Sequence, residues 1–332
     1  MILLYVTGIT GHSGSWFIER MEREAAKAGG MPLPFAGVRC AVRPGSDASR
    51  LEASPLGIEI ARGDLDDADF LLRSMRGARA VLHIASIFNS PNVAEAALRS
   101  GVEWLVMVHT TGRYSKYKSA SEEYIKIEEA ILAMRDRIGV TVLRPTMIYG
   151  SSRDRNMWKL VDFLHRHTFF PLFGAGANLM QPVHARDLGN AYYDVLANRD
   201  CTFNRDYNLA GQRPISYLDL VRRVSWTLAQ CRADQDGSPN GRTAVPKGRN
   251  VIVKVPLSLS ILGAKLYNAV SRNPVISVEQ VLRMQEDKAF DFADAVRDFG
   301  YAPLSFEEGI VEEVREYLAS RGGRKGEARS DG

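Results

Sequence analysis

The sequence predicts an α/β protein in which helices cover both faces of a doubly wound parallel sheet, followed by a smaller, mostly helical C-terminal lobe. Three observations favour this class. Short apolar runs alternate with amphipathic stretches along residues 1–150, these runs lack the polar alternation of half-exposed strands, and a glycine-rich turn joins the first run to the first amphipathic stretch. Strands that alternate with helices favour a parallel sheet, and continuously apolar strands favour burial on both faces.

The individual elements follow from these patterns in order. Strands are expected over residues 2–7, 35–43, 57–61, 80–85, 104–109 and 140–143, and helices over 13–27, 66–75, 92–100 and 116–136. After Gly150 the alternation becomes less regular. There we expect a helix over 156–167, an aromatic, glycine-rich loop over 170–176, a strand and a helix within 181–198, a strand over 206–210, a loop over 233–250 and helical segments over 277–318.

This change of pattern predicts two lobes. Residues 1–150 and 182–211 are assigned to the sheet domain, and residues 151–181 and 212–319 to the second lobe. Residues 320–332 are polar and glycine-rich, and we expect a flexible tail there.

Composition excludes several classes of protein. With 332 residues, 45% of them apolar and 25% charged, the chain is an ordinary globular protein and not a disordered, collagen-like or disulfide-stapled one. The formal net charge is +4, and part of that excess lies in residues 320–332. The body of the protein has no basic stripe of the kind that follows a phosphate backbone, so we expect no nucleic-acid partner.

Cysteine usage and the apolar stretches predict a cytoplasmic protein. The three cysteines, Cys40, Cys201 and Cys231, are odd in number and lack CxxC spacing, which favours a reducing compartment and no metal site. The first residues, Met-Ile-Leu-Leu-Tyr-Val-Thr-Gly, show no basic region of a secretory signal. The most apolar later stretch, residues 251–270, is interrupted by lysine, proline and asparagine, and we expect no membrane span.

A turn with the sequence Thr7-Gly8-Ile9-Thr10-Gly11-His12-Ser13-Gly14 leads from the first expected strand into the first helix. A diphosphate must approach bare backbone N–H groups at the positive end of a helix, and glycines leave room for it. The spacing is GxxGxxG, and its position favours a phosphate-binding turn over a glycine turn without a ligand.

Four further motifs extend this pattern. Gly63-Asp64-Leu65 and His83-Ile84-Ala85-Ser86 follow the third and fourth expected strands, and residues 143–150 (Leu-Arg-Pro-Thr-Met-Ile-Tyr-Gly) and 181–187 (Gln-Pro-Val-His-Ala-Arg-Asp) come later. With these motifs the chain resembles the extended and atypical short-chain dehydrogenase/reductases over roughly residues 1–318. Within that family it looks nearest to the nucleotide-sugar epimerases, dehydratases and reductases of the NAD-dependent epimerase/dehydratase type. The resemblance implies a Rossmann-type sheet that binds a dinucleotide and a C-terminal lobe that binds the substrate.

The residues expected to contact the dinucleotide lie in the glycine-rich turn or after a strand. They are Gly8, Thr10, Gly11, His12, Ser13, Gly14, Arg43, Ser46, Asp64, Leu65, Ala85, Ser86, Thr110, Pro145 and Met147. The resemblance implies that Asp64 lies near the adenine edge and that Pro145 and Met147 flank the nicotinamide.

The end of the second strand favours NADP(H) over NAD(H). A ribose 2′-hydroxyl group is bound by an acidic side chain at that place, whereas a 2′-phosphate is bound by a cation. Arg43 follows the strand, and the first carboxylate after it is Asp47. A guanidinium group suits a dianionic phosphate, and Ser46 or His12 could add hydrogen bonds. The alternative is that Arg43 is simply solvated.

The resemblance also implies a Ser or Thr after the fifth strand and a Tyr-x-x-x-Lys pair on the next helix. Residues at i and i+4 share a helical face, so the lysine charge can favour the phenolate. Thr110 and Thr111 occupy the hydroxyl position, and one literal match follows, Tyr114-Ser115-Lys116-Tyr117-Lys118. This match lies only five residues after His109, which is early for the family.

The expected helix can also be aligned with the family through a Glu that the family places four residues after the lysine. Aligning it with Glu128 puts Tyr124 at the lysine position, and aligning it with Glu129 puts Ile125 there. Neither register preserves the pair. Three interpretations therefore stay open: Tyr114 with Lys118 as the acid/base pair, a displaced acid/base such as Tyr124 or Tyr117, or a dinucleotide-binding regulator or assembly scaffold without turnover.

Arg153, Arg155 and Asn156 are the candidate substrate residues, because guanidinium groups bind diphosphates. The alternative is an amphipathic helix with solvated charges. The leading hypothesis is an NADP(H)-dependent enzyme that transfers hydride to or from a carbohydrate or nucleotide-sugar carbinol, with Thr111 orienting the substrate oxygen and Tyr114 or Tyr124 carrying the proton. The helices expected near 92–100 and 116–136 could pair across a homodimer.

Overall fold

The computed structural model describes residues 3–30, 33, 35–117, 121–154, 156–235, 250–259, 261 and 278–327. The chain divides into two compact units. Unit 1 comprises Met1–Thr146, Ala185–Ala210 and Asp291–Pro303, and unit 2 comprises Met147–His184, Gly211–Phe290 and Leu304–Gly332.

Unit 1 is built on a parallel sheet. In the described part of the chain this sheet has seven strands in the order β11-β6-β5-β4-β1-β2-β3, and every neighbouring pair is parallel. The strands are β1 (Leu3–Thr7), β2 (Gly37–Val42), β3 (Glu59–Arg62), β4 (Ala78–His83), β5 (Trp104–Val108), β6 (Gly139–Pro145) and β11 (Asp206–Leu209). The strand order reverses between β1 and β4, so the predicted doubly wound Rossmann-type fold is confirmed.

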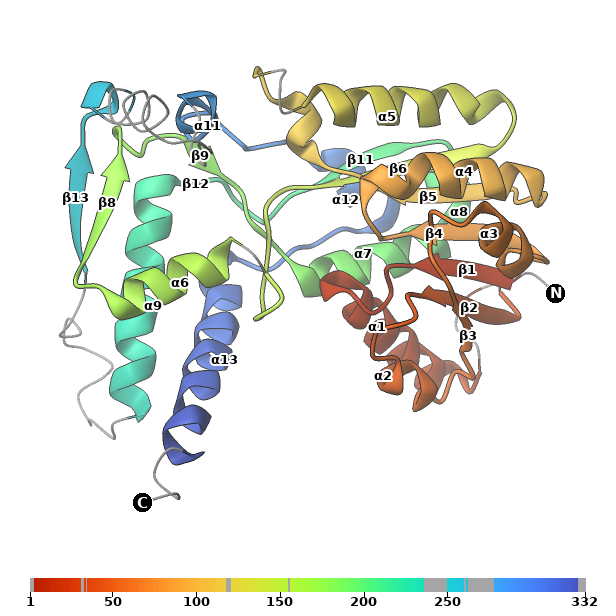
Figure 1. Ribbon diagram of the computed structural model, residues 1–332, viewed down its shortest axis with the longest axis horizontal. Coiled ribbons are helices and arrows are strands. Elements are labelled where there is room, and N and C mark those ends of the chain that lie inside the picture. The colour runs from red at the N-terminus through yellow and green to blue at the C-terminus, as the bar shows by residue number, and fades with distance from the viewer. Residues whose placement is uncertain are drawn as a thin grey trace. The chain divides into compact units, whose positions relative to one another are not determined.

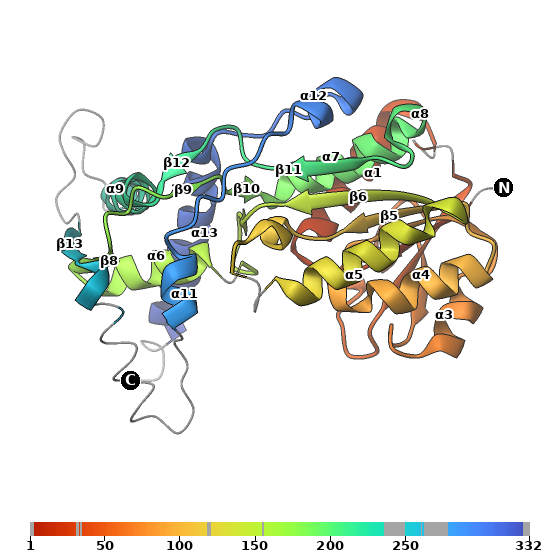
Figure 2. The same cartoon turned by 90° about the horizontal axis from the view of Figure 1, so that it is seen from above.

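Helices cover both faces of this sheet. On one face lie α1 (His12–Ala28) and α7 (Ala185–Ala197), and on the other lie α3 (Ala68–Ser74), α4 (Ser90–Arg99) and α5 (Glu122–Leu132) (Figures 1 and 2). The shorter helices of unit 1 are α2 (Ser49–Glu52), α8 (Arg199–Thr202), α12 (Ala293–Phe299) and the 3₁₀ turns η1 (Ile87–Asn89), η2 (Thr111–Tyr114) and η4 (Ala133–Asp136).

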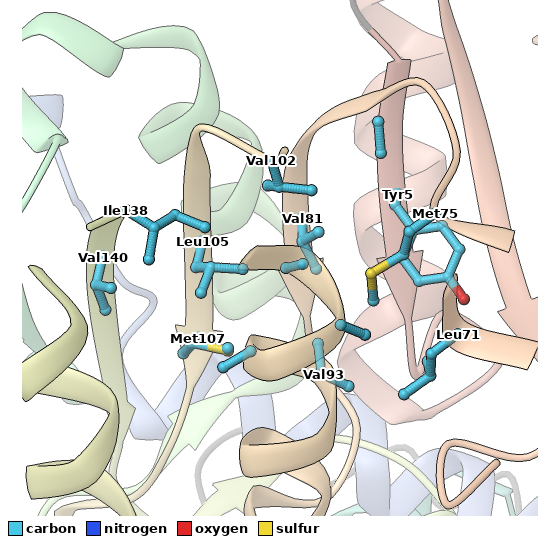
Figure 3. Packing of buried hydrophobic residues seen from close by; sticks show 14 of the residues in the cluster. Tyr5, Leu71, Met75, Val81, Val93, Val102, Leu105, Met107, Ile138 and Val140 are labelled. Atoms are coloured by element: carbon cyan, nitrogen blue, oxygen red, sulfur yellow. The ribbon is translucent and has the colours of Figure 1, made fainter. Parts of the chain in front are cut away.

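The core beneath α3 and α4 consists of alternate side chains of the strands. Tyr5, Val81 and Leu105 meet Met75 and Val93 there, and all five are fully buried (Figure 3). Each buried aliphatic side chain stabilises the fold by roughly 1.5–3 kcal/mol. The continuous apolar runs of the strands are explained by this burial, since the side chains between these positions face α1 and α7.

Unit 2 has a mostly helical core. Its helices are α6 (Met157–Arg166), α9 (Tyr217–Gln235), α11 (Val278–Arg283) and α13 (Phe306–Glu327), and buried side chains of α6, α9 and α13 pack together. Short strands also pair in this unit: β7 (Ile148–Tyr149) with β10 (Val183–His184), β9 (Leu179–Met180) with β12 (Ile215–Ser216), and β8 (Phe169–Phe173) with β13 (Val251–Val255).

Three expectations differ from the structure. The helix expected over 116–136 begins only at Glu122, because η2 ends at Tyr114 and Ser115 is extended with ψ 137°. Most of the loop expected over 170–176 is strand β8, whose residues pair in parallel with β13. The tail expected from residue 320 is helical as far as Glu327.

The expected lobe boundaries differ from those of the two units by a few residues, at 147–150, 182–184 and 211, and by one whole segment. Asp291–Pro303 was assigned to the second lobe, but it belongs to unit 1. Two tyrosine hydroxyl groups attach it there, since Tyr301 donates to the carbonyl of Ala210 at 2.9 Å and Tyr207 donates to Asp298 at 2.7 Å. Among the described residues, no helix is both long enough and apolar enough to cross a membrane.

Unit 2 contains a fully buried carboxyl group, that of Glu313 on α13. Its Oε2 accepts the N–H of Gly150 at 2.8 Å. Burial raises the pKa of Glu313 to about 9, and the negative charge of Asp154 adds to this shift. Asp154 is itself held in place, because it accepts the N–H groups of Asn156 and Trp158 where α6 begins. Glu313 is therefore protonated in the folded protein at neutral pH.

We expect Glu313→Gln to stabilise the protein at alkaline pH but not at acid pH. Unfolded Glu313 loses its proton near the ordinary value of 4.5, whereas the folded group keeps it to about 9, so the wild type loses stability between these values. Glutamine keeps the acceptor for Gly150 and does not ionise. Urea unfolding should show a gain on the order of 1–3 kcal/mol at about pH 8 and little change at about pH 5.

Glu307→Gln is the matched control, because Glu307 lies on the same helix and is exposed. It should change stability little at either pH. A gain for Glu313→Gln that is equal at both pH values would contradict the assignment of a raised pKa.

Candidate functional site

The glycine-rich turn between β1 and α1 is pressed against the end of β4. Gly8 has φ +74°, and a Cβ atom at this position would overlap the backbone of Ile84 and Ala85. The N–H of Gly11 donates to the carbonyl of Gly8 at 2.9 Å, and α1 begins at the next residue, His12. The turn is therefore closed by its own backbone, and only glycine fits at residue 8.

A cleft of about 550 Å³ opens beside this turn. The residues that line it follow the carboxyl ends of β1, β2, β3 and β4. They are Gly8, Thr10, Gly11, Ala41, Arg43, Ser46, Gly63, Asp64, Leu65, Asp66, Ile84, Ala85, Ser86 and Asn89. The cleft lies at the point where the strand order reverses, which is where open α/β sheets bind their ligands.

The cleft fits an adenine dinucleotide at its diphosphate end. Gly11 is exposed immediately before α1, and a Cβ atom there would approach the carbonyl oxygen of Gly8 to 2.9 Å. Bare backbone at the positive end of a helix is the arrangement that binds a diphosphate.

A guanidinium group, which suits a ribose 2′-phosphate, and a carboxylate, which suits a ribose 2′-hydroxyl group, both line the cleft. Arg43 and Asp64 are exposed there, and neither takes part in an ion pair among the described residues. The loop that carries Arg43 is closed by the N–H of Ser46, which donates to the carbonyl of Arg43 at 3.0 Å. The carboxylate of Asp66, by contrast, is engaged, because it accepts from the amides of Asn89 and Asn92 at 3.0 and 3.1 Å.

Nine of the fifteen predicted cofactor residues line this cleft: Gly8, Thr10, Gly11, Arg43, Ser46, Asp64, Leu65, Ala85 and Ser86. The other six do not. His12, Ser13 and Gly14 belong to the first turn of α1, where the hydroxyl of Ser13 is bonded to that of Tyr192 at 3.0 Å. Thr110 caps η2, Pro145 ends β6, and Met147 belongs to unit 2.

Five lining residues were missed by the sequence analysis as site residues: Ala41, Gly63, Asp66, Ile84 and Asn89. Four of them lie within two residues of a predicted site residue. The rule that ligands bind at the carboxyl ends of parallel strands could therefore have found them. Asn89 lies on η1 and reaches the cleft only because that turn follows β4.

His83 connects the first and fourth strands beneath the cleft. Its Nδ1 is bonded to the hydroxyl of Thr7 at 2.7 Å and its Nε2 to the carbonyl of Ser86 at 3.1 Å. Burial lowers the pKa of His83 to about 4. The ring is therefore neutral at physiological pH and holds the two strand ends together.

A buried ion cluster lies between α5 and the ends of β5 and β6. The carboxylate of Glu128 accepts from Nε and Nη2 of Arg144 at 2.8 and 2.6 Å, and it also pairs with Arg113. Its second oxygen accepts from Nδ1 of His109 at 3.0 Å. Burial, with the charges of Arg144 and Arg113, lowers the pKa of His109 to about 3, so this contact joins a neutral imidazole to a carboxylate.

The cluster distinguishes the two neighbouring glutamates of α5. Glu128 is fully buried and paired with Arg144, whereas Glu129 is exposed. Tyr124 lies four residues before the buried glutamate, on the same helix.

The candidate catalytic side chains lie at different places around this cluster. Thr111 is buried and donates to the carbonyl of Pro145 at 3.1 Å. Tyr114 is 44% exposed, and its hydroxyl donates to Asn208 on β11 at 3.3 Å. Lys118 lies outside the described residues. Tyr124 is half-buried, and its ring lies 5.7 Å from that of Phe88 on η1.

The predicted substrate residues belong to unit 2. Arg153 is exposed, Arg155 lies outside the described residues, and Asn156 lines a cavity within unit 2. Within the described part of the chain, no three His, Cys, Asp or Glu side chains form a group that could hold a metal ion.

The strand order and the place of the cleft define a Rossmann-type fold. A mouse (Mus musculus) protein named short-chain dehydrogenase/reductase family 42E member 1 is 22% identical to the chain, over 83% of this chain and 80% of the relative. A dTDP-glucose 4,6-dehydratase from Streptomyces venezuelae, solved with NAD bound, superposes with a TM-score of 0.67 at 20% identity, over 97% of this chain and 98% of that one.

A UDP-glucuronic acid 4-epimerase from Bacillus cereus, solved with UDP-glucuronic acid and NAD, superposes with a TM-score of 0.68 at 15% identity, over 96% of this chain and all of that one. No protein-family model matches the chain. The resemblance to the extended short-chain dehydrogenase/reductases that the sequence predicted is confirmed by these relatives and by the fold.

We expect Glu128→Ala to destabilise unit 1 by about 3–5 kcal/mol, because it leaves the buried guanidinium of Arg144 without its main counter-charge. Glu129→Ala is the matched control and should change stability by no more than about 0.5 kcal/mol. Urea unfolding of both variants measures the difference. Equal effects of the two substitutions would show that the cluster does not hold α5 in place.

Proposed function

We propose that this protein is an NAD(P)-dependent oxidoreductase or epimerase that transfers hydride to or from a carbinol. The observation that carries the proposal is the closed glycine turn at the start of α1, beside a cleft at the switch point of the sheet. A bound nicotinamide dinucleotide would supply the hydride chemistry. The protein's own residues have to bind it, orient the substrate oxygen and move one proton.

NADP(H) is the proposed cofactor. Arg43 lines the cleft after β2, where the 2′ group of the adenine ribose would be bound, and its guanidinium is exposed to solvent. Asp64 lies after β3 and suits the adenine amino group. The neighbours solved with a cofactor contain NAD, so the preference for NADP(H) rests on Arg43 alone.

Tyr124 is the proposed proton carrier. Its ring packs against Phe88 of η1, and both the residue that caps this turn, Ser86, and its last residue, Asn89, line the cleft. Tyr114 instead reaches Asn208 on β11, three places from β4 in the sheet. On oxidation the substrate hydroxyl would give its proton to the phenolate of Tyr124 as its carbon loses hydride, and on reduction the phenol would return that proton. Thr111 would orient the substrate oxygen.

The proposed substrate is a carbohydrate or a nucleotide sugar. The two neighbours described above are a dTDP-glucose 4,6-dehydratase and a UDP-glucuronic acid 4-epimerase, and both are named for a nucleotide sugar. The competing function, a dinucleotide-binding regulator or scaffold, is not favoured by these comparisons. Transfer of label between NADPH and a panel of sugars and nucleotide sugars distinguishes the two, because a regulator would bind the cofactor and exchange no label.

We expect Arg43→Ala to weaken NADPH binding about 10- to 100-fold and to leave NADH binding unchanged. A charge-assisted hydrogen bond to the 2′-phosphate contributes about 1.5–3 kcal/mol, and NADH lacks that group. Calorimetry with both cofactors on both proteins measures this. Arg76→Ala is the control, since Arg76 is exposed at the opposite ends of the strands and its loss removes the same charge.

If wild type binds the two cofactors equally, the preference for NADP(H) is wrong. If it binds neither at millimolar concentration, the proposed function is wrong as a whole.

We expect Tyr124→Phe to lower turnover about 100-fold or more and to leave cofactor affinity intact, because only the proton-carrying hydroxyl is removed. Tyr114→Phe and Tyr117→Phe should retain most of the activity. Initial rates of cofactor reduction with a substrate found in the label-transfer panel provide the measurement. Full activity of Tyr124→Phe together with loss of activity in Tyr114→Phe would transfer the role to Tyr114.

A further inference from the structure

Unit 2 contains a cavity of its own. Its volume is about 320 Å³, within the range of sites that hold small organic molecules. Residues of α6, β9 and α9 line it, together with residues that follow α11.

The lining is mostly apolar and rich in methionine. Met157, Met180 and Leu220 are buried in its wall, and Met284 lies at its mouth with 39% of its surface exposed. Methionine side chains are flexible and polarisable, so they adapt to apolar ligands of varied shape. The described residues that line the cavity include no arginine and no carboxylate. A nucleoside diphosphate would therefore lack the guanidinium groups that bind it best.

Lys288 supplies a half-buried cationic group to this mostly apolar wall, whereas the other lysine that lines it, Lys159, is exposed. Its N–H donates to the carbonyl of Leu179 at 2.7 Å, which places the residue beside β9. Burial lowers the pKa of Lys288, the charge of Arg283 lowers it further, and Glu286 opposes the shift. None of the ion pairs within the described part of the chain includes Lys288. A ligand carboxylate would restore a counter-charge to its ammonium group.

Asn178 supplies a second polar group. It is only 8% exposed, and its Oδ1 has no hydrogen-bond partner among the described residues. Its backbone is fixed, since its carbonyl accepts the N–H of Tyr217 at 2.9 Å. A buried acceptor without a partner costs free energy that a ligand hydroxyl group could recover.

We propose that this cavity binds a small amphipathic hydroxy acid. Its apolar body would fill the methionine-lined space, its carboxylate would pair with Lys288, and its hydroxyl group would donate to Asn178. The inference goes beyond the proposed redox function and does not depend on it, because every group that it uses lies in unit 2.

The test is binding of defined probes to the full chain without any dinucleotide. Hydroxydecanoate, decanoate, decanol and UDP are titrated below their micelle concentrations, with calorimetry as the readout. We expect hydroxydecanoate to bind more tightly than decanoate, and decanoate more tightly than decanol. Tighter binding of UDP than of decanoate, or no binding of any fatty probe, would overturn the proposal.

Matched variants locate the binding site. Lys288→Met keeps the length and the apolar part of the side chain, and it should weaken the binding of both acids about 10-fold or more while leaving decanol unchanged. Lys254→Met is the control, because Lys254 is exposed on β13 and does not line the cavity. Asn178→Leu should remove the advantage of hydroxydecanoate over decanoate. Equal losses in the two lysine variants would mean that the acids bind elsewhere.

Failure of this test leaves the redox proposal untouched, since cofactor titration uses unit 1. Conversely, absence of dinucleotide binding would not affect the fatty-acid titration. Circular dichroism of each variant separates loss of the site from loss of the fold.

Discussion

The contact between the backbone of Gly8 and that of Ala85 is the constraint on which the candidate site depends. Gly8 has a positive φ and no room for a Cβ atom, so the turn after β1 can lie directly against the chain that leaves β4. His83 strengthens the same junction from below, through its bonds to Thr7 and Ser86. Since β1 and β4 are the strands where the winding reverses, this junction forms the floor of the cleft. A side chain at residue 8 would separate the strand ends and widen the place where a diphosphate has to meet the start of α1.

The second constraint is electrostatic and lies on the other side of β5. The carboxylate of Glu128 pairs with two guanidinium groups, those of Arg144 and Arg113, and a neutral histidine completes its hydrogen bonds. Asp206 gives Arg144 a second counter-charge at 3.1 Å. Burying charges is costly unless each has a partner, so such a cluster specifies one position of α5 more than it adds stability. That position places the ring of Tyr124 5.7 Å from that of Phe88 on η1, the turn that follows β4. In the proposed function, the charge cluster acts by fixing the position of this phenol.

Much of the fold could be predicted from the sequence, because the central strands such as β1 and β5 are apolar runs and the glycine turn directly follows the first of them. The residues that follow the strands and line the cleft could be predicted as well, because ligands of such sheets bind at the carboxyl ends of the strands. What could not be predicted depends on distant contacts. Glu128 and Glu129 are adjacent, and only the packing of α5 on Arg144 shows which one is buried. Likewise the Tyr114–Lys118 spacing suggested a shared helical face, but the chain after Tyr114 is extended. Asp291–Pro303 returns to unit 1 through two tyrosine hydroxyl groups, for which the local sequence offers no signal.

Unit 2 shows how buried polar groups can indicate function when sequence motifs do not. Glu313 is buried but has a backbone donor and stays protonated, so its burial is explained by the local structure. Asn178 and Lys288 differ from it, since the described residues provide neither an amide partner for the first nor an ion pair for the second. Both line one cavity whose remaining wall is mostly apolar. Packing of the cavity wall alone does not require polar side chains at these two positions. Aliphatic ones would avoid the cost of an unsatisfied buried polar group, which is about 1–3 kcal/mol. Retaining two such groups around the same empty volume is accounted for most simply by a ligand that carries the complementary groups.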